Sequence, residues 1–183
     1  EIADFMVLAL LHDIGAFKTD DVRKQMTFEA KNPMPHSVYG YLFLKYLSPL
    51  EEQSKIILYH HTDYNKTKDM DYRYRFELEA LKVAEIMDVW QRSFGAKFDH
   101  KLIHNYAGTK FDPKICRLLD TAVEEFDIFT KLRNKTFKDE YAESLEYVLL
   151  SDDEKEKYLK MLMYCTGLKE EQTVSETVAT IYV

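Results

Sequence analysis

The stretch Leu10-Leu-His-Asp-Ile-Gly15 contains the most informative pair of residues in this chain. His12 supplies a neutral nitrogen ligand, and Asp13 supplies a carboxylate that is able to bridge two cations. Divalent transition metals suit imidazole and carboxylate ligands, and two such ions close together activate a water for attack on phosphorus. The pair therefore indicates a metal site with hydrolytic chemistry.

Four further residues extend this pair into one ordered set. His36, the adjacent His60 and His61, and Asp88 follow at intervals of 24, 24 and 27 residues. Each interval is about one helical hairpin long, so each ligand returns to the same end of a helical bundle. A lone histidine is usually an ordinary surface or core residue. An ordinary polar network would require every one of these spacings to be coincidence, so the set predicts a metal centre.

The pattern of the whole chain predicts an all-α fold. Glycine and proline are scarce, with five and four residues, and strand-like alternation is almost absent. Residues 2–12 are apolar on most sides, as in a buried helix, and Gly15 follows as a helix stop. A long helix over about 76–92 places Asp88 on the face of Leu78 and Leu81, so we expect its carboxylate to point toward the core. Residues 63–74 are expected to form a loop.

The composition excludes several functional classes. The 183 residues include 46% hydrophobic ones, which allows a substantial core and excludes disorder throughout. A net charge of -7 argues against a nucleic-acid duplex as partner, although a small phosphorylated ligand remains compatible because bound cations reverse the local sign. No apolar run reaches the roughly 18 residues that span a bilayer, so no membrane partner is expected. Two cysteines outside any CxxC motif favour a reducing cytoplasm.

Four segments resemble the motifs of the HD superfamily of metal-dependent phosphohydrolases. They are Leu10-Leu-His-Asp-Ile-Gly15, His36-Ser-Val-Tyr-Gly40, Tyr59-His-His61 and Ala84-Glu-Ile-Met-Asp88. The doubled histidine and the spacings are most similar to the HD-GYP branch, and Phe111-Asp-Pro113 matches a segment near the end of that domain. The resemblance implies an HD-domain helical bundle over 1–132, followed by extra C-terminal helices over 133–183.

The resemblance also implies the chemistry and the ligands. Two divalent ions are expected, iron or manganese first, with magnesium, nickel and zinc as alternatives. His12 would ligate one metal, Asp13 would bridge, and Asp88 would complete the first site. His36, His60 and His61 would serve the second or an additional ion. A hydroxide held between the cations would attack a phosphodiester of a nucleotide or cyclic dinucleotide, in a bacterial-type signalling enzyme.

Three departures from the family pattern affect the expected activity. The Gly-Tyr-Pro loop of the branch is missing, because Thr62-Asp-Tyr-Asn-Lys66 follows the histidine pair. The lysine that usually follows His-Asp-Ile-Gly is Ala16, and Lys18 is the candidate replacement as a catalytic phosphate contact. Arg92, one turn after Asp88, is a second candidate for a phosphate oxygen. The alternative is a degenerate HD regulatory module that keeps metal or ligand binding without turnover.

The third departure is that the helix expected before Glu1, which donates the first ligand histidine in the family, is absent from this sequence. Residues 171–180 resemble the start of such a helix, with Glu176 in the ligand position. Three interpretations stay open. The segment begins a second HD domain, forms an ordinary terminal helix, or completes the site of a neighbouring chain by a helix swap in a homodimer.

One further pair has a spacing suited to a metal. His100 and His104 lie four residues apart, which places them on one side of a helix. No third ligand is evident nearby in the sequence, so a surface pair is the favoured interpretation.

Overall fold

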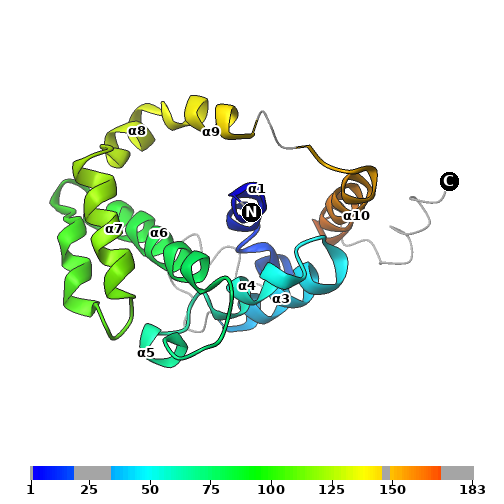
Figure 1. The fold of residues 1–183 in the computed structure, drawn as a ribbon, viewed down its shortest axis with the longest axis horizontal. Helices are drawn as coiled ribbons and strands as arrows, with labels where there is room; N and C mark the ends of the chain where they lie inside the picture. The colour runs from blue at the N-terminus through cyan, green and yellow to red at the C-terminus, as the bar shows by residue number, and fades with distance from the viewer. Residues whose placement is uncertain (1, 19–33, 146–148, 170–183) are drawn as a thin grey trace. The chain divides into compact units, whose positions relative to one another are not determined.

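The structure is a computed structural model that describes residues 2–18, 34–145 and 149–169 (Figure 1). Within these ranges the secondary structure is helical, apart from one isolated bridge between Ala107 and Phe111. The expected all-α fold is confirmed. The contacts divide the chain into two units, Glu1–His61 with Leu149–Val183, and Thr62–Val148. These units are groups of contacts, and the expected domain boundary at residue 132 stays a prediction.

The first unit is built around the helix α3. Its described elements are α1 (Ile2–Leu10), the 3-10 helix η1 (Ile14–Lys18), α3 (Met34–Leu47), η2 (Glu52–Ser54), α4 (Lys55–Tyr59) and α10 (Asp152–Lys169). Helix α3 packs against η1, α4 and α10. Its core is formed by fully buried aliphatic side chains, Leu8, Leu44, Leu50, Ile56 and Ile57. These contacts place the turn after α1 and the end of α4 beside α3.

Gly15 allows η1 to pack closely against α3. A Cβ built on Gly15 would lie 2.0 Å from the carbonyl oxygen of His36 and 2.4 Å from the amide nitrogen of Gly40. Gly15 was expected as a helix stop, but α1 already ends at Leu10 and Gly15 lies within η1. Of the described glycines only Gly95 and Gly108 have a positive φ, so Gly15 is not a left-handed cap. The residue is small because α3 passes against its α-carbon.

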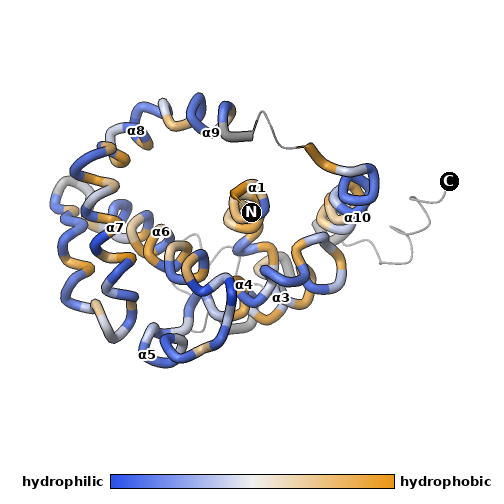
Figure 2. Tube along the Cα trace, viewed as in Figure 1, coloured by the Kyte–Doolittle hydropathy of each residue, from blue (hydrophilic) through white to orange (hydrophobic). Residues whose placement is uncertain are grey.

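The second unit is a group of shorter helices around α6 and α7. Its elements are α5 (Tyr64–Thr67), α6 (Arg75–Phe94), η3 (Gly95–Lys97), η4 (His100–Tyr106), α7 (Pro113–Glu124), α8 (Ile128–Asn134) and α9 (Phe137–Leu145). Apolar and hydrophilic residues alternate along α6 and α7, as in helices buried on one side (Figure 2). The core cluster joins Val83, Met87, Ile103, Phe111, Ile115, Cys116 and Leu119. The expected loop over 63–74 contains one short helix, α5.

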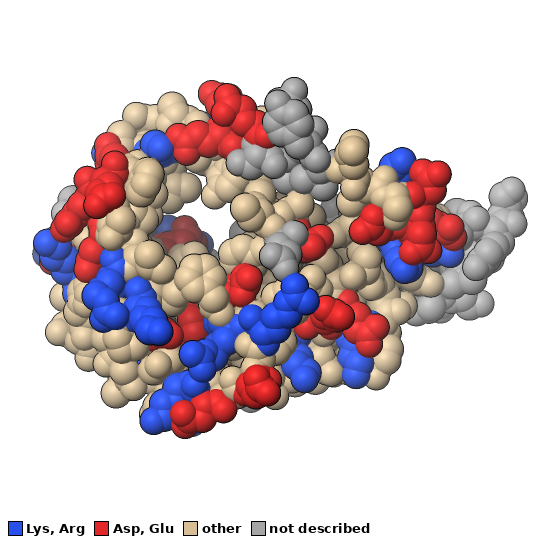
Figure 3. Space-filling view, viewed as in Figure 1, with Lys and Arg blue, Asp and Glu red and all other residues tan. Residues whose placement is uncertain are grey.

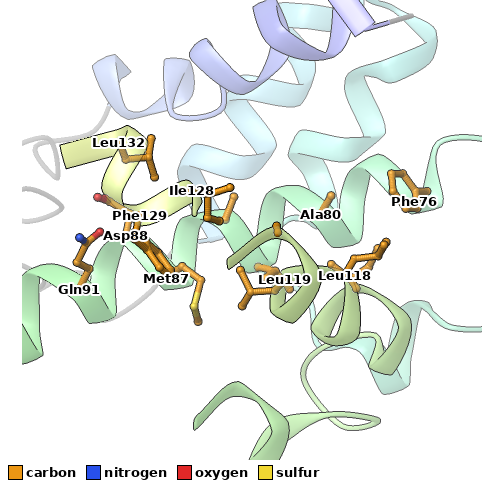
Figure 4. Close-up of a pocket in the computed structure, with 14 residues that line it drawn as sticks. Phe76, Ala80, Met87, Asp88, Gln91, Leu118, Leu119, Ile128, Phe129 and Leu132 are labelled. Atoms are coloured by element: carbon orange, nitrogen blue, oxygen red, sulfur yellow. The ribbon is translucent and has the colours of Figure 1, made fainter. Parts of the chain in front are cut away.

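Helices α6, α7 and α8 border an apolar groove of about 470 Å³ (Figure 4). Phe76 and Met87 line it from α6, and Phe129 and Leu132 line it from α8. Asp88 is the one ionisable residue of the lining.

Helix α10 carries both signs of charge on its surface (Figure 3). Ion pairs join Lys155 to Asp152, Lys157 to Asp153 and Lys160 to Glu156. Neighbouring residues of one helix thus compensate each other, as on an ordinary hydrated face. Across the described ranges, no helix combines the length and the apolar character that crossing a membrane requires.

Candidate metal centre

Three histidines from two helices of the first unit converge on one point. His36 lies in the first turn of α3, and His60 and His61 directly follow α4. The Nε2 atom of His36 lies 3.3 Å from Nε2 of His60 and 3.0 Å from Nε2 of His61. Among the described residues, this is the only group of three or more potential ligands whose donor atoms all lie within 4.8 Å of one another.

The His12-Asp13 pair lies beside this group. Its turn follows α1, and the packing of η1 on α3 holds it there. One carboxylate oxygen of Asp13, Oδ2, lies 3.3 Å from Nε2 of His12, while Oδ1 lies 3.4 Å from Nε2 of His36. The two oxygens therefore face different histidines, which is the arrangement that a bridging carboxylate needs. The ring centroid of His12 lies 6.0 Å from that of His60.

Backbone carbonyls fix the orientation of two of these rings. Nδ1 of His12 donates to the carbonyl of Ala9 at 2.7 Å, and Nδ1 of His60 donates to that of Ile57 at 2.6 Å. A carbonyl only accepts, so the proton of each neutral ring is on Nδ1 and the lone pair is on Nε2. The last carbonyls of a helix lack partners within the helix, and each of these histidines uses one from the helix that precedes it. Histidines that bind a metal through one ring nitrogen typically donate a hydrogen bond from the other nitrogen in this way.

The environment keeps His60 and His61 neutral. Burial, together with the nearby His61 ring, lowers the pKa of His60 well below its usual value of 6.5. Burial and the nearby His36 ring lower the pKa of His61 to about 4. Both imidazoles are therefore free of a second proton near neutral pH, as metal binding requires.

Asp13 is ionised under the same conditions. Burial raises the pKa of its carboxyl group, but the contact with His12 and the electrostatic effect of the His12, His36 and His60 rings outweigh burial and lower the pKa to about 2. The site thus offers an anionic oxygen ligand beside neutral nitrogen ligands. This mixed set suits divalent iron, manganese, nickel or zinc.

The crowded nitrogens fit a bound cation. A proton on Nε2 of His36 can be donated to Nε2 of His60 or to Nε2 of His61, but not to both. Two ligands bound at about 2.1 Å from one ion lie about 3.0 to 3.4 Å apart, which matches the observed separations of 3.0 and 3.3 Å. The residues present therefore fit the metal that the sequence predicts. The assignment of each ligand to a particular ion stays a prediction.

Asp88 lies in the second unit, and its expected orientation is wrong. Its side chain is 62% exposed and pairs with Arg92 one helical turn further on. The helical period correctly placed Asp88 on α6. However, the period does not tell whether another element covers that face of α6 around Asp88. The expected roles of Asp88 as a ligand and of Arg92 as a phosphate contact stay predictions.

Two other expectations concern charged residues near the chain's motifs. Lys18 ends η1, and its side chain lies outside the described part of the structure. Glu176, together with the expected helix over 171–180, also lies outside the described residues. Ala16 is buried, so the position usually taken by lysine faces the protein interior.

Comparison with known proteins identifies the family. The family model of the HD domain matches residues 2–93, which contain the whole predicted ligand set. The chain therefore belongs to the HD-domain family, a superfamily of metal-dependent phosphohydrolases. No curated protein and no solved structure gives a significant match.

Proposed function

We propose that this protein is a metal-dependent phosphohydrolase that cleaves a phosphodiester bond of a nucleotide or cyclic dinucleotide. The observation that carries the proposal is the convergence of three histidine Nε2 atoms beside a carboxylate whose two oxygens face different histidines. Two divalent cations close together supply the activation of a water molecule for in-line attack on phosphorus. The HD-domain match supports the same chemistry.

The protein's own residues would hold and orient these cations. Asp13 presents one oxygen toward His12 and the other toward His36, so it is the proposed bridge between two ions. His36, His60 and His61 form the proposed ligand group of the second ion. We include Asp88 as the proposed remaining ligand of the first ion.

The HD-domain match supports a small phosphorylated molecule as the substrate class, and we propose a nucleotide. The doubled histidine favours a cyclic dinucleotide and a divergent HD-GYP-like branch as the specific proposal.

Removal of the bridging carboxylate tests the mechanism. We expect Asp13→Asn to bind less manganese or iron, because the neutral amide is a poor ligand, and to lose at least about 100-fold of hydrolytic activity, equivalent to roughly 3 kcal/mol of transition-state stabilisation. Metal content by plasma mass spectrometry and hydrolysis of a panel of phosphomonoesters, nucleotides and cyclic dinucleotides are the measurements.

The matched control is Asp71→Asn, which removes an exposed carboxylate outside the predicted ligand set. It should keep wild-type metal content and activity. Hydrolysis that survives in folded Asp13→Asn, or a reconstituted wild-type protein that binds no metal, would contradict the proposal.

A second candidate function is a regulatory module that binds metal or ligand without turnover. The buried position of Ala16 favours it, because this site cannot provide the usual lysine contact to phosphate. This candidate predicts binding of a cyclic dinucleotide to the metal-loaded protein with no hydrolysis on prolonged incubation. Measurable hydrolysis that Asp13→Asn abolishes would exclude it.

A further inference from the structure

A second group of potential ligands lies in the other unit, between η4 and α7. His100 and His104 come from η4, and Asp120 comes from α7. Oδ2 of Asp120 lies 2.8 Å from Nε2 of His104, and Oδ1 lies 3.6 Å from Nε2 of His100. The sequence shows no third potential ligand near this pair, but the structure places Asp120 there, sixteen residues after His104.

Two atoms of this group are buried without a hydrogen-bond partner. They are Nε2 of His100 and Oδ1 of Asp120, and their separation of 3.6 Å is too long for a hydrogen bond. A buried polar atom without a partner is costly, at about 1 to 3 kcal/mol, and native proteins contain few of them. A cation between these two atoms would satisfy both at once.

The surrounding structure holds the group in place. Asp99 caps η4 by accepting a hydrogen bond from the amide of Lys101 at 2.9 Å. Ile103, which lies between the two histidines in η4, is fully buried in the core cluster that also contains Leu119 of α7. The ring of His100 packs near that of Phe129. The backbone positions of the ligands are therefore set by packing in the core.

We propose that His100, His104 and Asp120 form a second metal site, which takes a divalent first-row transition metal such as zinc. Two histidines and one carboxylate form a common set of protein ligands for such ions and leave positions for water. Ligands at about 2.1 Å from one ion lie about 3.4 Å apart in tetrahedral geometry, close to the 3.6 Å between His100 and Asp120. The donor atoms of His100 and His104 are not all within 4.8 Å of one another and of Asp120 as they are in the first group, so one ring must turn to bind the same ion. The His104 side chain is 39% exposed, which allows it to rotate toward the ion.

The remaining potential ligands nearby have other roles. Cys116 lies one turn before Asp120, but it is buried in the core cluster, and burial raises the pKa of its thiol to about 11. The thiol therefore stays protonated and is a poor ligand. Glu124, one turn after Asp120, pairs with Lys101 at 3.4 Å.

Zinc titration of the full chain tests the site independently of the first one. In a His61→Gln background, which weakens the first centre, we expect a bound zinc ion that is lost when His104→Gln is added. Asp120→Asn should raise the zinc dissociation constant of this site at least about tenfold. The measurements are isothermal titration calorimetry with zinc, and the visible absorption of bound cobalt as a substitute probe.

Glu124→Gln is the matched control, because it removes a carboxylate from the same helix without touching either histidine. It should leave zinc binding unchanged. Unchanged zinc stoichiometry in folded His104→Gln would overturn the proposal and leave Asp120 as a hydrogen-bonding link between η4 and α7. An equal loss in Glu124→Gln would also overturn it, since binding would then reflect surface charge. If Asp120→Asn fails to fold, zinc binding by His104→Gln, a change at an exposed position, tests the proposal.

Discussion

His12 and His60 use the same local device, although they lie in different parts of the chain. Each donates Nδ1–H to the carbonyl three residues earlier, at the end of the helix that precedes it. The hydrogen bond fixes the tautomer, so that the proton is on Nδ1 and Nε2 presents its lone pair to the site. A histidine that follows a helix end by one or two residues is therefore well suited to bind a metal.

The low pKa of His61 predicts how the metal-free protein responds to acid. In the unfolded chain a histidine titrates near 6.5, whereas folded His61 titrates at about 4. Between these values the unfolded state binds more protons, so the free energy of unfolding decreases as pH falls from about 6.5 to about 4, and this contribution levels off below that range. His60 contributes in the same direction.

Urea unfolding of chelator-treated protein across this pH range measures the effect. His61→Gln removes one of the titrating groups, so its stability should depend less steeply on pH than that of the wild type. Equal pH dependence in the two proteins would show that His61 titrates normally when folded.

At the scale of elements, Gly15 controls the contact between η1 and α3. We expect Gly15→Ala to destabilise the protein by about 3 kcal/mol, because the new methyl group would meet backbone atoms of His36 and Gly40, which cannot rotate away. Metal affinity should fall as well, since the contact holds Asp13 beside His36. Chemical denaturation and metal titration are the measurements.

Gly40→Ala is the graded control for this contact. Its new Cβ would lie 2.9 Å from the Cγ2 methyl of Ile57, a fully buried side chain that would have to move, whereas alanine favours the helical conformation of α3. The expected loss of unfolding free energy is therefore about 1 to 2 kcal/mol, smaller than for Gly15→Ala, where the new methyl group meets backbone atoms. If the two alanine variants were equally stable, close backbone approach at Gly15 would not be the controlling factor.

The proximity of the residues in the proposed first centre was predictable from the sequence, and the reason is their regular spacing. Intervals of one helical hairpin correctly predicted that the His12-Asp13 turn, His36 and the histidine pair lie together. The helical period also placed Asp88 on α6, but burial depends on which neighbour covers a face, and the sequence pattern of one helix does not contain that information.

Asp120 was not predictable for a related reason. Its proximity to His100 and His104 depends on how η4 packs on α7, which is a tertiary contact made through Ile103 and the core cluster. The role of Gly15 was missed because a glycine after an apolar helix usually ends that helix. Only the close approach of α3, which the sequence does not reveal, distinguishes a glycine that ends a helix from a glycine that allows close packing.

At the scale of the whole molecule, the first centre links segments that are distant in the sequence but belong to one unit. The turn after α1, the start of α3 and the end of α4 all contribute side chains to it. We therefore expect manganese at a hundred times its dissociation constant to stabilise the protein by about 2.7 kcal/mol. Amide hydrogen exchange should slow in these three segments, and much less in α8 and α9.

A matched sample with chelator provides the reference for this experiment, and Asp13→Asn provides the control for metal bound elsewhere. Protection confined to other segments, or equal protection in the variant, would show that the added metal binds outside the proposed centre.

The positions of His12 and His60 just beyond helix ends have an electrostatic consequence. The carboxyl end of a helix carries partial negative charge, and α1 and α4 both end at the proposed centre. Without cations, these helix dipoles and the Asp13 carboxylate would repel a phosphate group; with cations, the sign of the local field reverses. We therefore expect an ordered process, in which the metal binds first and an anionic substrate binds only to the metal-loaded protein.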